Sequence, residues 1–267
     1  MEPSVESPQI EATEPVESSI EEHANVLFKP NPGPQTEFLA ASERECLYGG
    51  SAGGGKSYAM LADPLRYMGH PQFSGLLLRH TTEELRELIF KSQELYPKIW
   101  PGIKWSERKM QWTAPSGARL WMSYLDRDED VLRYQGLAFS WIGFDELTQW
   151  GSPYAWNYMR SRLRSTAPDL PIFMRATTNP GGRGHHWVKK MFIDPAPFNR
   201  SFDATDIETG EILRYPAGHS KAGKPLFKRR FIPARLTDNP YLAESGDYEA
   251  MLLSLPEQQR RQLLEGD

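Results

Sequence analysis

The chain has 267 residues, of which 39% are hydrophobic, and this length and composition favour one large α/β domain with appendages over an array of several domains. No apolar run approaches the roughly eighteen residues of a membrane helix, the N-terminus lacks the pattern of a secretion signal, and the single cysteine, Cys46, cannot form an internal disulfide, so a cytoplasmic protein is expected. The formal net charge is −4, but seven Glu and no Lys or Arg occur in the first 26 residues, so about +3 remains for the rest of the chain.

Residues 1–26 are rich in Glu, Pro and Ser and poor in aromatic residues. This composition predicts a disordered acidic tail, because little apolar surface is available to offset the entropy of ordering. From residue 27 onward, short apolar runs alternate with helix-like segments, which predicts a mainly parallel sheet flanked by helices. The expected strands are Cys46–Gly49, Gly75–Leu78, Trp141–Phe144 and Pro171–Ala176.

Other segments have their own signals. Thr82–Tyr96 has apolar residues at helical spacing, with Thr81 or Thr82 as N-cap. Two β-like runs, Met110–Thr113 and Arg119–Ser123, flank a short turn and predict a hairpin. The Pro- and Gly-rich stretch after Pro195 predicts irregular loops, so residues from about 195 to 267 are expected to form a lid or linker, with a helix over Tyr248–Leu264 that is interrupted at Pro256.

The segment Gly50–Ser57 satisfies the pattern G-x-x-x-x-G-K-[ST] between an expected strand and an expected helix. Glycines allow successive backbone N–H groups to surround a polyphosphate, and the following helix adds its positive end. Lys56 would reach the β- and γ-phosphates of ATP, and the Ser57 hydroxyl suits Mg²⁺. The glycines of this expected ATP site are Gly50, Gly53, Gly54 and Gly55. The alternative interpretation is a glycine-rich turn that contains Lys-Ser by chance.

The apolar run Trp141–Phe144 ends in Asp145 and Glu146, a Walker B pattern. Asp145 would hold Mg²⁺ directly or through water, and Glu146, on the other side if strand alternation persists, would polarise the attacking water. Without the upstream loop, two acids at a strand end would indicate only a polar strand-to-loop transition.

The expected strand Pro171–Ala176 leads into Thr177, Thr178 and Asn179. If this strand lies beside the phosphate-loop strand, the Asn179 amide, which both donates and accepts hydrogen bonds, could sense the γ-phosphate. The same residues, followed by Pro and Gly, are equally typical of a turn.

Together, the glycine-rich loop, Phe144–Thr148 and Thr177–Pro180 resemble the large terminase subunit of tailed bacteriophages. The resemblance extends over Phe28–Asp267, and Tyr134–Glu146 is its most specific part. Asp238–Tyr241 and Leu263–Asp267 also resemble the end of that family's ATPase segment.

The resemblance implies a P-loop fold of the additional-strand, catalytic-glutamate type and an ATPase that uses ATP and Mg²⁺. It implies translocation of double-stranded DNA into a procapsid in the host cytoplasm, by a ring of subunits on the portal protein, with the small terminase subunit as a further partner and no membrane. It also implies that Gln35 contacts adenine and that Thr177, Thr178 and Asn179 couple hydrolysis to movement.

Many terminases have an arginine inside the phosphate loop, whereas this chain has Ser51–Gly54 there. A neighbouring subunit would then supply the guanidinium that stabilises the transition state. Arg133 is the first candidate for this arginine and Arg79 the second, and for each the alternative is a surface ion pair.

The family's nuclease is expected to be absent, since the chain stops where that domain normally begins. His185-His186 is a weak metal candidate, because adjacent side chains on an extended segment point apart. Arg183–Arg235 has eleven Lys or Arg against five Asp or Glu, so DNA-gripping residues are sought there. The candidates from charge alone are Lys189, Lys190, Arg229 and Arg230. The alternative functions are another P-loop nucleic-acid ATPase, such as a helicase, and a non-hydrolysing nucleotide-binding assembly module.

Overall fold

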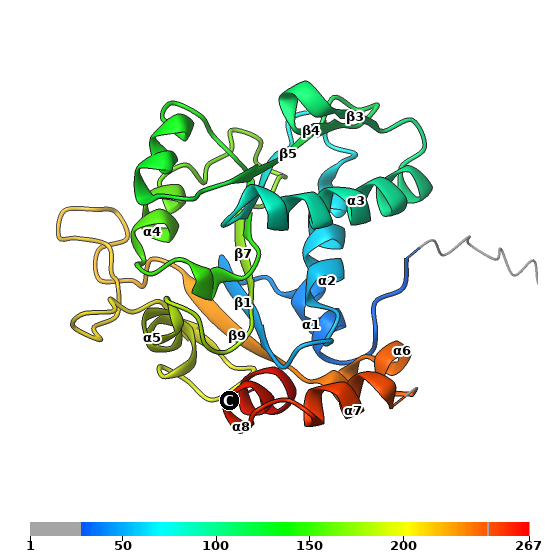
Figure 1. Cartoon of the computed structure of the whole chain (residues 1–267). Helices are drawn as coiled ribbons and strands as arrows, with labels where there is room; N and C mark the ends of the chain where they lie inside the picture. The colour runs from blue at the N-terminus through cyan, green and yellow to red at the C-terminus, as the bar shows by residue number, and fades with distance from the viewer. Residues whose placement is uncertain (1–27, 245, 267) are drawn as a thin grey trace, which may run out of the picture.

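The computed structural model describes residues 28–244 and 246–266 (Figure 1), so the predicted tail lies outside the described residues. The strands are β1 Glu45–Gly50, β2 Ser74–Arg79, β3 Lys104–Ser106, β4 Gln111–Thr113, β5 Arg119–Tyr124, β6 Trp141–Phe144, β7 Phe173–Thr178, β8 Ser201–Asp203 and β9 Lys228–Ala234. The helices are α1 Pro34–Ala40, α2 Lys56–Ala62, α3 Thr82–Ile99, α4 Tyr154–Arg160, α5 His185–Val188, α6 Pro240–Ala243, α7 Asp247–Leu253 and α8 Glu257–Arg260. Within these described ranges, no helix is both long and apolar enough to cross a membrane.

The nine strands form one sheet in the order β3-β4-β5-β2-β6-β7-β1-β9-β8. The six central strands, β5-β2-β6-β7-β1-β9, pair in parallel. Strands β3 and β4 at one edge and β8 at the other pair antiparallel. The prediction of a mainly parallel sheet is therefore confirmed. Strand β7 lies between β1 and β6, so the glycine-rich loop after β1 and the acids after β6 emerge at the same edge of the sheet, one strand apart.

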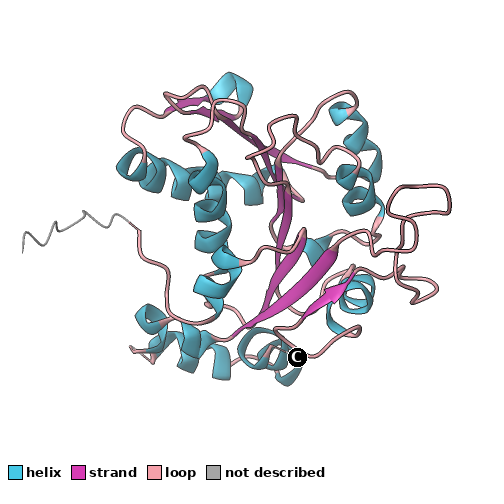
Figure 2. Cartoon of the chain, turned by 180° about the vertical axis from the view of Figure 1, so that it is seen from behind, coloured by secondary structure: helices cyan, strands magenta, loops and turns pink. Residues whose placement is uncertain are grey.

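Helices cover both faces of the sheet, with α1, α2 and α3 on one face and α4 and α5 on the other (Figures 1 and 2). Alternation along the strands sends side chains into two separate cores. In β1, for example, Cys46 and Tyr48 lie in the core under α2 and α3, whereas Leu47 lies in the core under α4 and α5. Burial on both faces explains why the central strands are continuous apolar runs.

The helix predicted over Thr82–Tyr96 is α3, which continues to Ile99. Its N-cap is Thr81, whose hydroxyl accepts a hydrogen bond from the Glu84 N–H while the Glu84 carboxylate accepts one from the Thr81 N–H. This reciprocal capping box satisfies two backbone donors that the first turn would otherwise leave free.

The hairpin of β4 and β5 forms as predicted, and β5 also pairs in parallel with β2, so the hairpin extends the main sheet. The helix expected over Tyr248–Leu264 is broken before Pro256, since α7 ends at Leu253 and α8 begins at Glu257.

Two expectations for the C-terminal third are wrong. The irregular lid or linker from about residue 195 contains β9, a strand of seven residues that pairs with β1 over Arg229–Ala234. Four of its seven residues are charged or proline, so the apolar pattern of a central strand is weak. His185 and His186 lie at the start of α5 rather than on an extended segment.

Candidate active site

The segment Gly50–Ser57 forms a tight loop between β1 and α2. Gly50 has a φ of 134°, and a Cβ there would lie 2.1 Å from the Ala234 carbonyl oxygen of β9, so only glycine fits. Beside the loop is a cavity of about 390 Å³. It is lined by Ala52–Tyr58 from the loop and α2, by Glu87 and Lys91 of α3, by Glu146 and Asn179 at the ends of β6 and β7, and by Asn239, Leu242 and Tyr248 from the C-terminal segment.

Lys56 is the first residue of α2 and is only 6% exposed. Its ammonium donates hydrogen bonds to the carbonyl oxygens of Ser51, at 2.6 Å, and Gly50, at 3.4 Å. Burial lowers the pKa of Lys56 to about 8, although the carboxylates of Glu146 and Asp145 oppose this shift. The site thus contains a partly desolvated cation, for which phosphate oxygens would be strong acceptors.

Asp145 follows β6 and is fully buried. Its Oδ1 accepts a hydrogen bond from the Thr177 hydroxyl, and its Oδ2 lies 3.0 Å from Nε of Arg79. The Arg79 N–H is not directed at that oxygen, so this contact is an ion pair rather than a hydrogen bond. Asp145 therefore lies behind the cavity wall, with both oxygens engaged by residues of β7 and β2.

Glu146 lines the cavity, and its backbone has a φ of 59°, which is uncommon for a residue other than glycine. The strand alternation expected at this position has ended, because Glu146 caps a short turn, Leu147–Gln149. Its two carboxylate oxygens accept hydrogen bonds from the side-chain amide of Asn179, at 2.8 Å, and from the Asn179 N–H, at 3.1 Å. Asn179 thus holds the carboxylate of Glu146 in one orientation.

The pKa of Glu146 is raised above that of an ordinary glutamate. Burial is the largest cause and the adjacent Asp145 carboxylate is the second, while Lys56, Arg79 and the Asn179 N–H act in the opposite direction. A carboxylate with a raised pKa is a stronger base, so Glu146 is suited to accept a proton from water near neutral pH.

The two threonines of β7 do not line this cavity. Thr177 donates to Asp145 and accepts a hydrogen bond from the Glu146 N–H at 3.1 Å. On the opposite side of the strand, the Thr178 hydroxyl lies 2.9 Å from both the Thr148 hydroxyl and the Asn179 carbonyl oxygen and donates its one proton to one of them. Thr177 thus orders Asp145 and Glu146, and Thr178 orders the Asn179 backbone. Either threonine could affect a bound nucleotide only indirectly, through Glu146 or Asn179.

Gln35 of α1 is 5% exposed, and both ends of its side chain are bound to the protein. Its amide nitrogen donates to the Gly55 carbonyl oxygen at 3.0 Å, and its Oε1 accepts from the Asn31 N–H at 2.6 Å. It also lines a second cavity, of about 520 Å³, together with Phe28, Lys29, Asn31, Gly55, Tyr58, Leu95, Asn239, Tyr241 and Leu242. An adenine ring in this cavity would meet the side-chain amide of Gln35, which is already hydrogen-bonded to the phosphate loop at Gly55.

The two candidate arginines have different surroundings. Arg79, at the end of β2, is 8% exposed and faces Asp145 of its own chain, so it does not present its guanidinium to a neighbour. Arg133 has a side chain that is 46% exposed and is paired with Asp130 one turn away, which is the surface ion pair given as its alternative.

The candidates for gripping DNA are also unequal. Arg229 is 1% exposed and bound to Glu45 at 2.7 Å, so it cannot meet a phosphate backbone. Arg230 lies 3.2 Å from Glu37, and Lys189 lies 3.4 Å from Asp194. In the ranges 28–244 and 246–266 no group of three or more metal-ligating side chains is found, and His185 instead accepts a hydrogen bond from the Gly181 N–H at 2.9 Å.

Two residues at this site were not predicted. Tyr48 and Asn239 donate hydrogen bonds to carbonyl oxygens of the loop, at 2.8 and 2.6 Å. Tyr48 lies two residues before the loop in a strand predicted to be buried, so its hydroxyl needed a partner there. Asn239 lies 186 residues after Gly53, whose carbonyl oxygen it binds, a separation that local pattern does not bridge.

Comparisons with known proteins agree with this architecture. Residues 47–266 match the family described as Terminase large subunit, T4likevirus-type, N-terminal. No curated protein sequence matches the chain.

Solved structures resemble the whole fold. A mutant of the large terminase ATPase domain from Thermus phage P74-26 is 13% identical with a TM-score of 0.58, over 90% of this chain and 94% of that one. The large terminase of a thermophilic bacteriophage is 15% identical with a TM-score of 0.62, over 89% of this chain and 53% of that one. The latter protein in complex with ATP-gamma-S is 12% identical with a TM-score of 0.59, over 90% of this chain and 53% of that one. The chain thus spans about half the length of that terminase, and these identities show a shared fold alone.

Proposed function

The chain belongs to the terminase large subunit family, and from this membership we propose that it hydrolyses ATP to drive double-stranded viral DNA into a procapsid. The observation that carries the proposal is that Lys56 and Glu146 line the same cavity. A cation for phosphates and a base for water, at the same edge of the sheet, are the two groups that phosphoryl transfer to water requires.

In the proposed mechanism, the N–H groups of the loop and the Lys56 ammonium bind the triphosphate. Lys56 exchanges its bonds to Ser51 and Gly50 for phosphate oxygens. Glu146, held by Asn179, accepts the proton of the attacking water. Asn179 thus contacts the base rather than the phosphate, so a γ-phosphate would be sensed through a change in the Glu146–Asn179 contact.

The residues present fit Mg²⁺ together with nucleotide phosphates. Ser57 lines the cavity, and Mg²⁺ in such sites is bound by few protein oxygens and several waters. The Asp145 Oδ2 is buried and accepts no hydrogen bond among the described residues, but Arg79 lies beside it, so a contact through water fits better than a direct one. When bound, the ion would neutralise the negative charge that develops on the phosphates.

The test is steady-state ATP hydrolysis by the full chain with Mg²⁺, with and without DNA. We expect hydrolysis that double-stranded DNA stimulates, and more so with procapsids that carry a portal. Stimulation by forked strands alone would indicate a helicase-like enzyme. Tight ATP binding without turnover under all these conditions would indicate a nucleotide-binding assembly module.

We also propose that the subunits form a ring on the portal protein in the host cytoplasm, with the small terminase subunit as a partner. Arg133 supports this arrangement better than Arg79, because its guanidinium is at the surface, where it pairs with Asp130 of the same short helix and lies 5.3 Å from the centroid of the Tyr124 ring. An exposed pair of this kind costs little to break, so a neighbouring nucleotide could take over the guanidinium.

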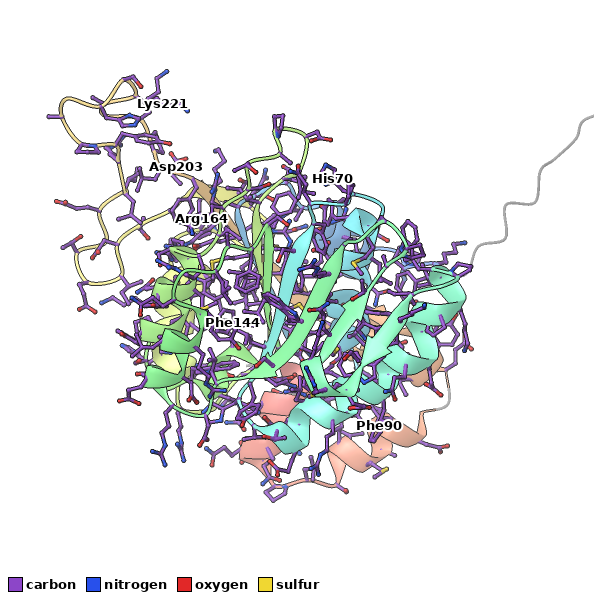
Figure 3. The ribbon with its side chains drawn as sticks, turned by 90° about the horizontal axis from the view of Figure 1, so that it is seen from above. His70, Phe90, Phe144, Arg164, Asp203 and Lys221 are labelled. Carbon is purple, nitrogen blue, oxygen red and sulfur yellow. The ribbon has the colours of Figure 1, made fainter. Side chains whose placement is uncertain are left out.

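A basic arm is the best-placed surface for the DNA backbone. We give this name to residues 213–226, which lie between β8 and β9 and contain Arg214, Lys221 and Lys224 but no Asp or Glu. All three cations are exposed, and none has a carboxylate within ion-pair distance among the described residues. Figure 3 shows Lys221 at the far end of this projecting segment and Asp203 near its base.

The arm is ordered by its own backbone. Tyr215 exchanges hydrogen bonds with Gly223 and Lys224, both at 3.0 Å, and its ring stacks on His219. Because these hydrogen bonds fix the backbone that carries the cations, less backbone entropy is lost when they meet phosphates.

Replacing Lys221 and Lys224 by Ala should weaken binding of duplex DNA and lower the slope of log affinity against log salt by about 2. Each lysine that meets a phosphate releases about one counterion, and fluorescence anisotropy at several salt concentrations measures the slope. Lys98→Ala with Lys109→Ala changes the net charge equally on the exposed surface near α3 and is the matched control. An equal effect of the two pairs would show that only net charge matters and would refute the arm as a binding surface.

A further inference from the structure

The outer side of the phosphate loop is held by three side chains. The carbonyl oxygens of Gly53, Gly54 and Gly55 accept hydrogen bonds from the Asn239 amide at 2.6 Å, the Tyr48 hydroxyl at 2.8 Å and the Gln35 amide at 3.0 Å. The donors come from three separate parts of the chain: β1, α1 and the residue before α6. Each of three consecutive peptide groups is therefore anchored independently.

Peptide planarity connects these bonds to the inner side of the loop. In a trans peptide, the carbonyl of one residue and the N–H of the next point in opposite directions. Carbonyls turned outward at Gly53 and Gly54 therefore turn the N–H groups of Gly54 and Gly55 inward. Glycine peptides rotate with little steric resistance, since no Cβ restricts φ and ψ. Side-chain donors on the outside are thus a direct means to keep these N–H groups in place.

We infer that Tyr48 and Asn239 are positioning residues that aim the N–H groups of Gly55 and Gly54 at a bound polyphosphate. This inference rests on the proposed ATPase function and specifies how the loop is organised for it. Neither residue touches the phosphates; each acts through the peptide that its side chain binds.

Tyr48 is suited to this role by its surroundings. It is fully buried, and its ring stacks on Phe38 with centroids 5.2 Å apart. The ring would remain in place without its hydroxyl, so Tyr48→Phe removes the hydrogen bond alone. The Gly54 carbonyl would then be buried without a partner, which favours rotation of the peptide toward another donor.

Asn239 connects the loop to the C-terminal segment. A Cβ at Gly53 would lie within 3.1 Å of side-chain atoms of Leu236, Leu242 and Tyr248, so this segment packs directly on the loop. The Asn239 amide adds a directed bond to that packing, and its Oδ1 lies 3.5 Å from the Asn31 amide. A shift of the C-terminal segment would therefore change the hydrogen bond between Asn239 and the Gly53 carbonyl oxygen.

The experiment measures binding of ATP and of inorganic tripolyphosphate to the full chain by titration calorimetry. We expect Tyr48→Phe and Asn239→Ala each to lower the affinity for both ligands by roughly fivefold, which corresponds to the loss of one hydrogen bond. The loss should be equal for the two ligands, because the anchored N–H groups contact only phosphate. A loss with ATP but not with tripolyphosphate would indicate a base contact and overturn the inference.

The matched control is Tyr96→Phe. Tyr96 is also fully buried, and its hydroxyl donates to the Leu61 carbonyl oxygen at 2.9 Å, near the far end of α2. This variant should lower thermal stability as much as Tyr48→Phe but leave both affinities unchanged. Equal affinities in the two variants, whether both reduced or both normal, would overturn the inference. Failure of the unsubstituted chain to bind ATP would instead refute the proposed function.

Discussion

Glu146→Gln is expected to lower kcat for ATP hydrolysis by about a thousandfold while ATP still binds. The amide has the size of the carboxylate but cannot accept a proton from water. The partner at Asn179 can adapt, because its side-chain amide can rotate to pair with an amide in place of the carboxylate. Steady-state turnover and equilibrium binding of ATP, measured on the same preparation, test the two parts of this prediction.

The control is Glu83→Gln, which neutralises an exposed carboxylate in the first turn of α3. Its kcat should equal that of the unsubstituted chain. If Glu146→Gln also retains its turnover, another group activates water and the role assigned to Glu146 is wrong.

The raised pKa of Glu146 adds a pH dependence. Because its pKa in the folded state exceeds the ordinary value of 4.5, the folded chain retains the proton at a pH where the unfolded chain has lost it. The stabilisation is complete below that ordinary value and is lost as pH rises through the raised pKa. Glu146→Gln should therefore lack this decline in folding stability, and be the more stable form at pH 7.

In the unsubstituted enzyme, activity should fall as pH drops through the raised pKa of Glu146, since the base must be ionised.

Arg79→Met is expected to cost about 3–5 kcal/mol of folding stability. The substitution retains an apolar side chain of similar length but leaves the Asp145 carboxylate buried without its cation. Asp145 is fully buried, so water cannot replace the guanidinium without rearrangement of β6 and β2. Urea unfolding followed by tryptophan fluorescence measures the loss.

Arg133→Ala is the control, since it breaks the exposed pair with Asp130 and should cost less than about 1 kcal/mol. A double-mutant cycle with Asp145→Asn isolates the interaction, because neutralising Asp145 should recover much of the loss caused by Arg79→Met. Additive losses in that cycle would show that packing, and not charge, is what Arg79 contributes.

Much of the core could be predicted from the sequence, because its signals are local. Four of the central strands, the N-cap of α3 and the loop before Lys56 each depend on residues within about ten positions of one another. The alternation of strands and helices predicted a mainly parallel sheet. The position of Pro171–Ala176 beside the phosphate-loop strand was only a condition of the hypothesis for Asn179, and the pairing of β7 with β1 meets it. The bounds of β6 match, and those of the other three strands differ by one or two residues, as expected where strand ends depend on tertiary contacts.

Where prediction failed, the deciding contact joins distant positions. Strand β9 has charged residues because Arg229 is neutralised by Glu45, which lies 184 residues earlier. A buried Arg is stable only with such a partner, and the sequence around either residue does not predict which residue that partner is. The same holds for Arg79, the second candidate for a neighbour's arginine, because local pattern does not show that it faces Asp145 of its own chain in a buried ion pair.

The sequence by itself determined which groups are available for chemistry: a glycine-rich loop with Lys56, two acids after a buried strand, and an amide at Asn179. Only the tertiary structure decided how those groups are used, with Asn179 on Glu146, Gln35 on the loop and Asp145 behind the cavity wall. The physical reason is the separation along the chain over which each kind of interaction acts. Backbone conformation follows neighbours along the chain, whereas a buried charge or hydrogen-bonding group takes its partner from whichever segment the fold brings within about 3 Å.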